Sequence, residues 1–136
     1  MPVFLDTNIL VYSISLTEAD REKRRRAEAL IAEQTCVVSI QTLQEFYVQA
    51  TRPGKTHRLT HEDAAAIVTL WLRFPVVENT AALLRSALDL KGSVNFSIWD
   101  CLIIAAARAG GCDTLYTEDM QDGRTIEGVK IVNPFA

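Results

Sequence analysis

The sequence predicts an α/β fold with a mainly parallel sheet of five strands and helices on both faces. Short apolar runs alternate with longer helical segments along the whole chain. This alternation is typical of βαβ units, whose right-handed crossovers cover both faces of a sheet. The length of 136 residues is that of one domain, so we expect residues 1–136 to form a single unit.

The five expected strands are short apolar runs that end at turn residues or at residues that start helices. They span residues 3–5, 36–38, 75–77, 114–116 and 129–132. None contains a charged residue except the last, which includes Lys130. Runs of this kind are typical of strands that are buried inside a parallel sheet.

The expected helices lie between these strands and start at residues that favour the N-cap position. The first follows Asp6 or Thr7, and the others span about residues 18–34, 40–51, 61–74, 80–91 and 98–109. Their expected N-caps, from the third helix on, are Ser39, Thr60, Asn79 and Ser97. The last helix is apolar nearly all round, Trp99 included, so we expect it to be buried.

Composition excludes several classes of protein. Hydrophobic residues make up 49% of the chain, too much for a disordered protein. The longest strictly apolar run, residues 101–107, is far short of the roughly 20 residues that cross a bilayer. The N-terminus lacks the features of a signal peptide, so we expect a cytoplasmic protein without a membrane partner. The three cysteines have no C-x-x-C spacing, which indicates free thiols.

Acidic residues follow the predicted strands. Asp6 follows the first strand, Glu45 lies in the helix after the second, and Asp100 lies in the first turn of the 98–109 helix. Three further acids follow the fourth strand: Glu118, Asp119 and Asp122. Because ligands of open parallel sheets bind beyond the carboxyl ends of the strands, this architecture could bring these acids to one edge.

Each acid also has a purely structural interpretation. Asp6 could be only an N-cap, Asp100 could form a capping box with Ser97, and Glu45 could be a solvated helix residue. The three acids at 118–122 could be ordinary turn residues. Together, however, clustered carboxylates repel one another unless a hard cation such as Mg²⁺ or Mn²⁺ neutralises them. Such an ion can activate water for attack on a phosphodiester.

Several segments resemble the motifs of the PIN-domain ribonucleases, and they occur in the family's order. The opening segment 4–10 carries Asp6-Thr7-Asn8, and the segments 39–46 and 97–103 carry Glu45 and Asp100. Residues 115–119, then Gly123, and residues 131–135 resemble the family's last strands. The resemblance covers nearly the whole chain.

The resemblance implies a Mg²⁺- or Mn²⁺-dependent endoribonuclease. Small prokaryotic members are mostly VapC-type toxins, which are silenced by a cognate antitoxin and usually form homodimers. By similarity, Asp6 and Asp100 are the expected direct metal ligands, and Glu45 and an acid of the fourth motif complete the catalytic set. The family's T-x-D pattern favours Asp119 as that acid, with Asp122 as the alternative. The expected groups that hydrogen-bond to the metal ligands are Thr7, Asn8 and Thr117.

The net charge of −3 argues against binding of nucleic acid by bulk charge alone. We therefore expect local basic groups to guide the RNA substrate, namely Arg52, Lys55 and Arg58, with the basic run 21–26 as a further candidate. The purely structural interpretation of that run is a solvated helix face, on which Asp20–Arg24 and Glu22–Arg26 have the spacing of ion pairs.

Two other functions stay open at this point. One is a PIN fold that binds RNA or protein without cleaving it. The other is a Mg²⁺-dependent phosphatase of the haloacid-dehalogenase type, in which the Asp after the first strand is the nucleophile. That class has a second Asp two positions on, where this chain has Asn8.

Overall fold

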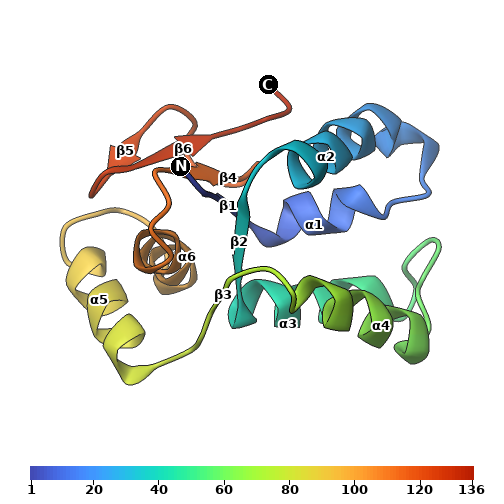
Figure 1. Cartoon of the computed structure of the whole chain (residues 1–136), viewed down its shortest axis with the longest axis horizontal. Helices are drawn as coiled ribbons and strands as arrows, with labels where there is room; N and C mark the ends of the chain where they lie inside the picture. Colours follow the sequence, from blue (N-terminus) through green and yellow to red (C-terminus); the bar gives the residue numbers. More distant parts are fainter.

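The computed structural model describes all residues 1–136 and contains one sheet of six strands in the order β3-β2-β1-β4-β6-β5 (Figure 1). The strands are β1 (Val3–Leu5), β2 (Cys36–Ser39), β3 (Val76–Val77), β4 (Thr114–Tyr116), β5 (Thr125–Ile126) and β6 (Val129–Val132). All neighbouring pairs are parallel except β5 and β6. Val3 of β1 lies opposite both Cys36 and Thr114, so β1 occupies the middle of the sheet.

The prediction of five strands was wrong by one, because β5 pairs with β6 in a tight hairpin. Thr125 lies opposite Lys130 and Ile126 opposite Val129, which leaves a loop of Glu127 and Gly128. Both loop residues have positive φ, 48° and 83°. Two-residue hairpin turns with positive φ at both positions usually carry Asn-Gly or Asp-Gly. Because this turn carries Glu127-Gly128, the sequence does not predict the hairpin.

Six α-helices connect the strands, together with a short 3-10 helix at Glu18–Asp20. The helices are α1 (Thr7–Ser13), α2 (Arg21–Glu33), α3 (Ile40–Thr51), α4 (His61–Trp71), α5 (Ala81–Lys91) and α6 (Ile98–Ala109). Figure 1 shows α5 and α6 on one side of the sheet and α1 to α4 on the other. The prediction of helices on both faces is confirmed.

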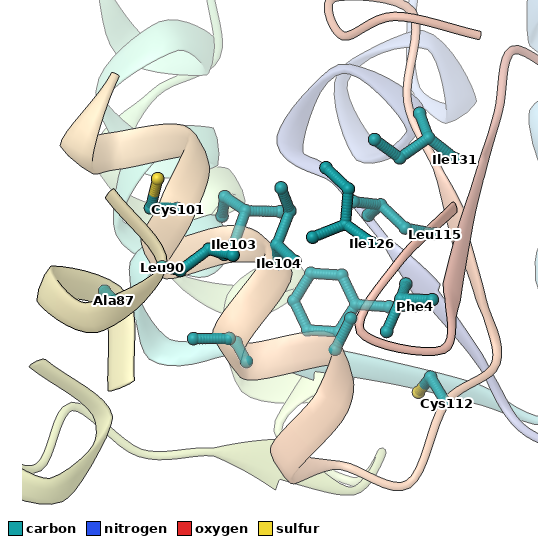
Figure 2. Packing of buried hydrophobic residues seen from close by; sticks show 14 of the residues in the cluster. Phe4, Ala87, Leu90, Cys101, Ile103, Ile104, Cys112, Leu115, Ile126 and Ile131 are labelled. Atoms are coloured by element: carbon teal, nitrogen blue, oxygen red, sulfur yellow. The ribbon is translucent and has the colours of Figure 1, made fainter. Parts of the chain in front are cut away.

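Alternation along the central strands divides the core into two clusters. Phe4 and Val37 belong to the cluster that includes α5 and α6, whereas Val3 and Leu5 belong to the cluster that includes α1 to α4. Figure 2 shows the Phe4 ring pointing from β1 toward Ile104 of α6. Because successive strand residues face opposite sides, both faces must be apolar, which explains the uninterrupted apolar runs of β1 and β2.

The helix boundaries differ from the predictions in local ways. Thr80, not Asn79, is the N-cap of α5, because the Thr80 hydroxyl accepts the backbone N–H of Leu83 at 3.1 Å. Helix α4 ends at Trp71 rather than Phe74. The predicted caps Ser39, Thr60 and Ser97 are confirmed by hydrogen bonds from the third residue of each helix.

The side chains of α6 are mostly buried as predicted, with one clear exception. Cys101, Ile104 and the three alanines at 105–107 are buried, but Trp99 is 65% exposed. All three cysteines are buried and free. No helix has both the length and the apolar character needed to span a membrane.

Candidate functional site: an acidic cleft at the ends of β1 and β4

Asp6 and Thr117 are the residues that directly follow the neighbouring strands β1 and β4. The Thr117 hydroxyl donates a hydrogen bond to Asp6 Oδ2 at 2.8 Å, and the backbone N–H of Thr7 donates to Asp6 Oδ1 at 2.7 Å. Asp6 is only 7% exposed. Burial raises its pKa from 3.8 to about 6, although both hydrogen bonds act in the opposite direction.

Asn8 connects α1 to the loop that follows β4. Its side-chain amide donates to Asp119 Oδ2 at 2.9 Å and to the Thr117 hydroxyl at 3.3 Å. The side-chain carbonyl of Asn8 accepts the backbone N–H of Glu118 at 3.3 Å. The fold thus holds the carboxylate of Asp119 beside the end of β1.

Glu45 and Asp100 approach the same cleft from α3 and α6. Glu45 accepts a hydrogen bond from Gln41, one turn earlier, at 2.8 Å. Asp100 is half-buried, and its backbone N–H donates to the Ser97 cap at 3.1 Å. Burial raises the pKa of Asp100, and the nearby charge of Asp119 adds to the rise.

The four acids predicted from the sequence therefore line one cleft of about 410 Å³: Asp6, Glu45, Asp100 and Asp119. The charges of Glu45 and Asp119 each contribute to the raised pKa of Asp6. None of the four carboxylates forms an ion pair. Lys55 is the one basic residue that lines the cleft. A larger cavity of about 570 Å³ between β3, α5 and α6 contains none of these acids.

The donor set fits a hard divalent cation. The polar groups around Asp6 are carboxylate, hydroxyl and amide oxygens, with no cysteine or histidine among the lining residues. The Thr7 hydroxyl is buried without a hydrogen-bond partner, so one polar atom beside Asp6 remains unsatisfied. No three acidic, histidine or cysteine side chains are close enough together to hold a metal by themselves. Mg²⁺ is usually held by one or two carboxylates and several waters, which suits this arrangement.

The structure separates the three acids of the loop after β4. Glu118 lines the cleft, but its carboxylate accepts from the Tyr12 hydroxyl at 2.6 Å and pairs with Lys23 of α2. Asp122 does not line the cleft, and its Oδ1 accepts the backbone N–H of Asn133 at 2.8 Å. Asp119 is the one whose carboxylate is tied to Asn8 beside Asp6.

The three groups predicted to support the acids differ in their contacts. Thr117 and Asn8 each donate to a carboxylate of the cleft. Thr7 contacts Asp6 through its backbone N–H, while its hydroxyl has no partner.

The predicted RNA-binding residues are not equivalent. Lys55 lines the cleft, whereas Arg52 is exposed directly after α3 and does not line it. Arg58 lines a separate hollow and donates to the Thr51 carbonyl at 2.6 Å.

The predicted pairs Asp20–Arg24 and Glu22–Arg26 were wrong, because these arginines find other partners. Arg24 bonds to Glu28, and Arg26 Nε reaches the Pro134 carbonyl at 3.4 Å.

Sequence reasoning missed several residues that line the cleft or contact its lining. Lys23 stood in a basic run that indicated a solvated helix face, yet it pairs with Glu118 across the fold. Gln41 could have been found from its i,i+4 spacing to Glu45. Tyr12 and Trp99 also line the cleft, although the apolar pattern of the 98–109 helix predicts a buried Trp99.

Comparison with known proteins finds one family. A family model described as PIN domain matches residues 3–121. A search among curated proteins finds no match to the sequence.

Solved structures with the same fold include three from prokaryotic toxin–antitoxin systems. VapC20 from Mycobacterium tuberculosis, a sarcin-ricin loop cleaving toxin, is 22% identical with a TM-score of 0.66, covering 86% of this chain and 91% of that one. A toxin–antitoxin complex from Klebsiella pneumoniae is 22% identical with a TM-score of 0.69, covering 97% of both chains. DNA-bound VapBC from Salmonella typhimurium is 24% identical with a TM-score of 0.56, covering 96% of both chains. These similarities show a shared fold.

Proposed function

Because the chain belongs to the PIN domain family, we propose that it is an endoribonuclease that depends on Mg²⁺ or Mn²⁺. The observation that carries the proposal is the cleft lined by Asp6, Glu45, Asp100 and Asp119, none of which has an ion-pair partner. Such a cluster is unfavourable by itself, since burial and like charges both raise the pKa of Asp6. A divalent cation removes this repulsion.

We assign Asp6 and Asp100 as the residues that would hold the ion, with Glu45 and Asp119 completing the acidic set. When bound, the ion supplies an activated water and neutralises charge that develops on the phosphodiester. The protein's own contribution is positioning. Thr117 and the Thr7 backbone orient Asp6, and Asn8 orients Asp119. Partners of this kind commonly set the affinity of a site for its metal.

Lys55 gives the cleft one positive charge, which can contact an RNA phosphate near the acids. The remaining arginines that we expected to contact RNA lie outside the cleft, so any contact from Arg52 would involve RNA that extends beyond it.

We further propose that the chain is the toxin of a VapBC-type pair, with a cognate antitoxin as its protein partner and a homodimer as its own assembly. The support is the fold shared with VapC20 and with toxin–antitoxin complexes over nearly the full length of each chain. Sequencing the DNA that flanks its gene tests this: a small adjacent reading frame is expected, and its product should co-purify with the chain on co-expression and suppress cleavage.

The test of the nuclease is a cleavage assay on structured RNAs of several classes with Mg²⁺, Mn²⁺ or EDTA. Cleavage should require a metal and should be lost in Asp6→Asn and in Asp100→Asn. Asp89→Asn, an exposed change on α5, is the matched control and should cleave like the unchanged protein. Metal binding by a folded protein without cleavage of any RNA would favour a non-catalytic PIN module. A phospho-aspartate trapped at Asp6 would favour the phosphatase.

A further inference from the structure

Trp99 is the exposed aromatic side chain of the acidic cleft. It lies in the first turn of α6, next to Asp100, and is 65% exposed. Seven other large hydrophobic residues are also exposed, but none of them lines the cleft: Met1, Leu16, Val48, Leu70, Leu72, Leu84 and Leu88. The other tryptophan, Trp71, is 7% exposed and packs edge-on against Phe46.

The Trp99 ring has no aromatic or cationic partner within the chain. The aromatic pairs involve other rings, and the cations that lie over rings contact Tyr12, Phe135 and Phe96. An indole is the side chain that gains most from covering its faces. At Trp99 no aromatic or cationic side chain of this chain supplies that gain.

The charges of the cleft indicate what kind of ligand this is. Phosphates are repelled by the four carboxylates except where a cation lies between them, and Lys55 is the only basic residue of the lining. Stacking of a base on an aromatic ring is attractive regardless of these charges. It also tolerates any base, because every base has a π-face.

We propose that Trp99 stacks on an unpaired base of the RNA next to the bond that is cut. The proposal rests on the proposed nuclease function and adds a substrate requirement to it. A base inside a duplex has both faces covered by its neighbours, so the site takes single-stranded RNA or a base that is turned out of a helix. Trp99 acts by binding substrate, so its loss should change KM and not kcat.

Tryptophan fluorescence in EDTA tests the contact without cleavage. A short single-stranded RNA should quench the emission of the unchanged protein and of Trp71→Phe, in which Trp99 is the only tryptophan. It should leave the emission of Trp99→Phe unchanged, because the remaining Trp71 is buried. The fully paired duplex of the same RNA should quench weakly. If Trp71→Phe folds poorly, the difference in quenching between the unchanged protein and Trp99→Phe is enough to test the contact.

Kinetics with Mg²⁺ give the second arm of the test. Trp99→Leu should raise KM about tenfold, the loss expected for one stacked base, with kcat within about twofold of the original. Trp99→Phe should recover most of the affinity, since a phenyl ring still stacks. Leu88→Ala, an exposed change on α5, is the control and should have no effect.

The outcomes separate this proposal from the proposed function. If the unchanged protein cleaves RNA, shows no quenching by single-stranded RNA, and has the same KM as Trp99→Leu, the stacking contact is overturned. The proposed nuclease function is then not contradicted. Quenching by single-stranded RNA without cleavage by any preparation would support the contact and count against the nuclease. If the emission of Trp99 changes with protein concentration but not with RNA, the ring lies at an interface between copies of the chain. This result would overturn the proposal.

Discussion

The Thr117 hydroxyl donates to Asp6 Oδ2 at 2.8 Å and accepts the backbone N–H of Asp119 at 3.1 Å. Thr117 is fully buried, so this hydroxyl has no water to replace either partner. It links the residue after β1 to the loop after β4, because the two strands are paired with Leu5 opposite Tyr116. One side chain thus orients a proposed metal ligand and the loop that carries another acid.

We predict that Thr117→Val weakens Mn²⁺ binding by about tenfold or more, since loss of a group that orients a metal ligand usually costs 10- to 100-fold. The change keeps the shape of the side chain and removes only the hydroxyl. Titration calorimetry with Mn²⁺ measures the effect. The control is Thr114→Val at the start of β4, which lies outside the cleft. Equal affinities in the two variants would contradict the role given to Thr117.

The raised pKa of Asp6 predicts how pH changes the stability of the metal-free protein. The folded chain binds a proton at Asp6 with a pKa of about 6, whereas the unfolded chain has the ordinary value of 3.8. The folded state therefore holds more protons between about pH 4 and 6. Its stability falls as pH rises through that window and stays lower above it. At pH 7 the cost of the charged carboxylate is on the order of 3 kcal/mol.

Asp6→Asn should remove this cost while keeping an oxygen for the cap of α1. We expect the metal-free variant to be at least as stable as the unchanged protein at pH 7, by up to about 3 kcal/mol. The difference should shrink toward pH 4. Urea unfolding in EDTA across this pH range measures it, with Asp89→Asn as the control. A large loss of stability at pH 7 would contradict the cost that we assign to the charged Asp6 carboxylate.

We expect opposite effects from changes at Asp119 and Asp122, the two candidate acids of the loop after β4. Asp119→Asn should lower the cleavage rate and leave stability nearly unchanged, because Asp119 is exposed and Asn8 can still bond to the amide oxygen. Asp122→Ala should cost about 1 kcal/mol of stability, because it leaves the Asn133 N–H without its acceptor, and should not affect metal binding. Cleavage kinetics and urea unfolding of both variants give the comparison. The reverse pattern would assign the fourth acid to Asp122.

Lys55 should account for more of the salt dependence of RNA binding than the neighbouring arginines. Lys55→Gln should reduce the slope of log affinity against log salt by about 0.7, the value for one phosphate contact on a single strand. Arg58→Gln should leave the slope unchanged, since Arg58 is bonded to Thr51 away from the cleft. Arg52→Glu should weaken cleavage and flatten its salt dependence if the RNA extends past the cleft. An unchanged slope in all three variants would remove this segment from the binding surface.

The features that the sequence predicted well are those set by neighbouring residues. Ser39 caps α3 and Ser97 caps α6 through hydrogen bonds to residues three positions later. The uninterrupted apolar run of β1 predicted a strand that is buried on both faces, as the two core clusters show. The order of the four acidic motifs likewise placed Asp6, Glu45, Asp100 and Asp119 on one cleft.

What the sequence did not predict depends on contacts between distant segments. Lys23 of α2 pairs with Glu118, two residues after the end of β4, and this pairing leaves Asp119 as the acid tied to Asn8. Trp99 is exposed because its side of α6 faces the cleft, which helical periodicity alone does not distinguish from the core. The β5–β6 hairpin was missed because its strand has two residues and its turn has a glutamate at positive φ.

Titration of the metal-free protein with Mn²⁺ tests the central claim that this cleft holds a divalent cation. The unchanged protein should bind Mn²⁺ and gain about 2.7 kcal/mol of stability when the ion is present at 100 times its dissociation constant. Asp6→Asn and Asp100→Asn should each lose this binding and this gain, while Asp89→Asn keeps both. If the unchanged protein does not bind at millimolar Mn²⁺, or if both cleft variants bind it equally well, the four carboxylates are not a metal site.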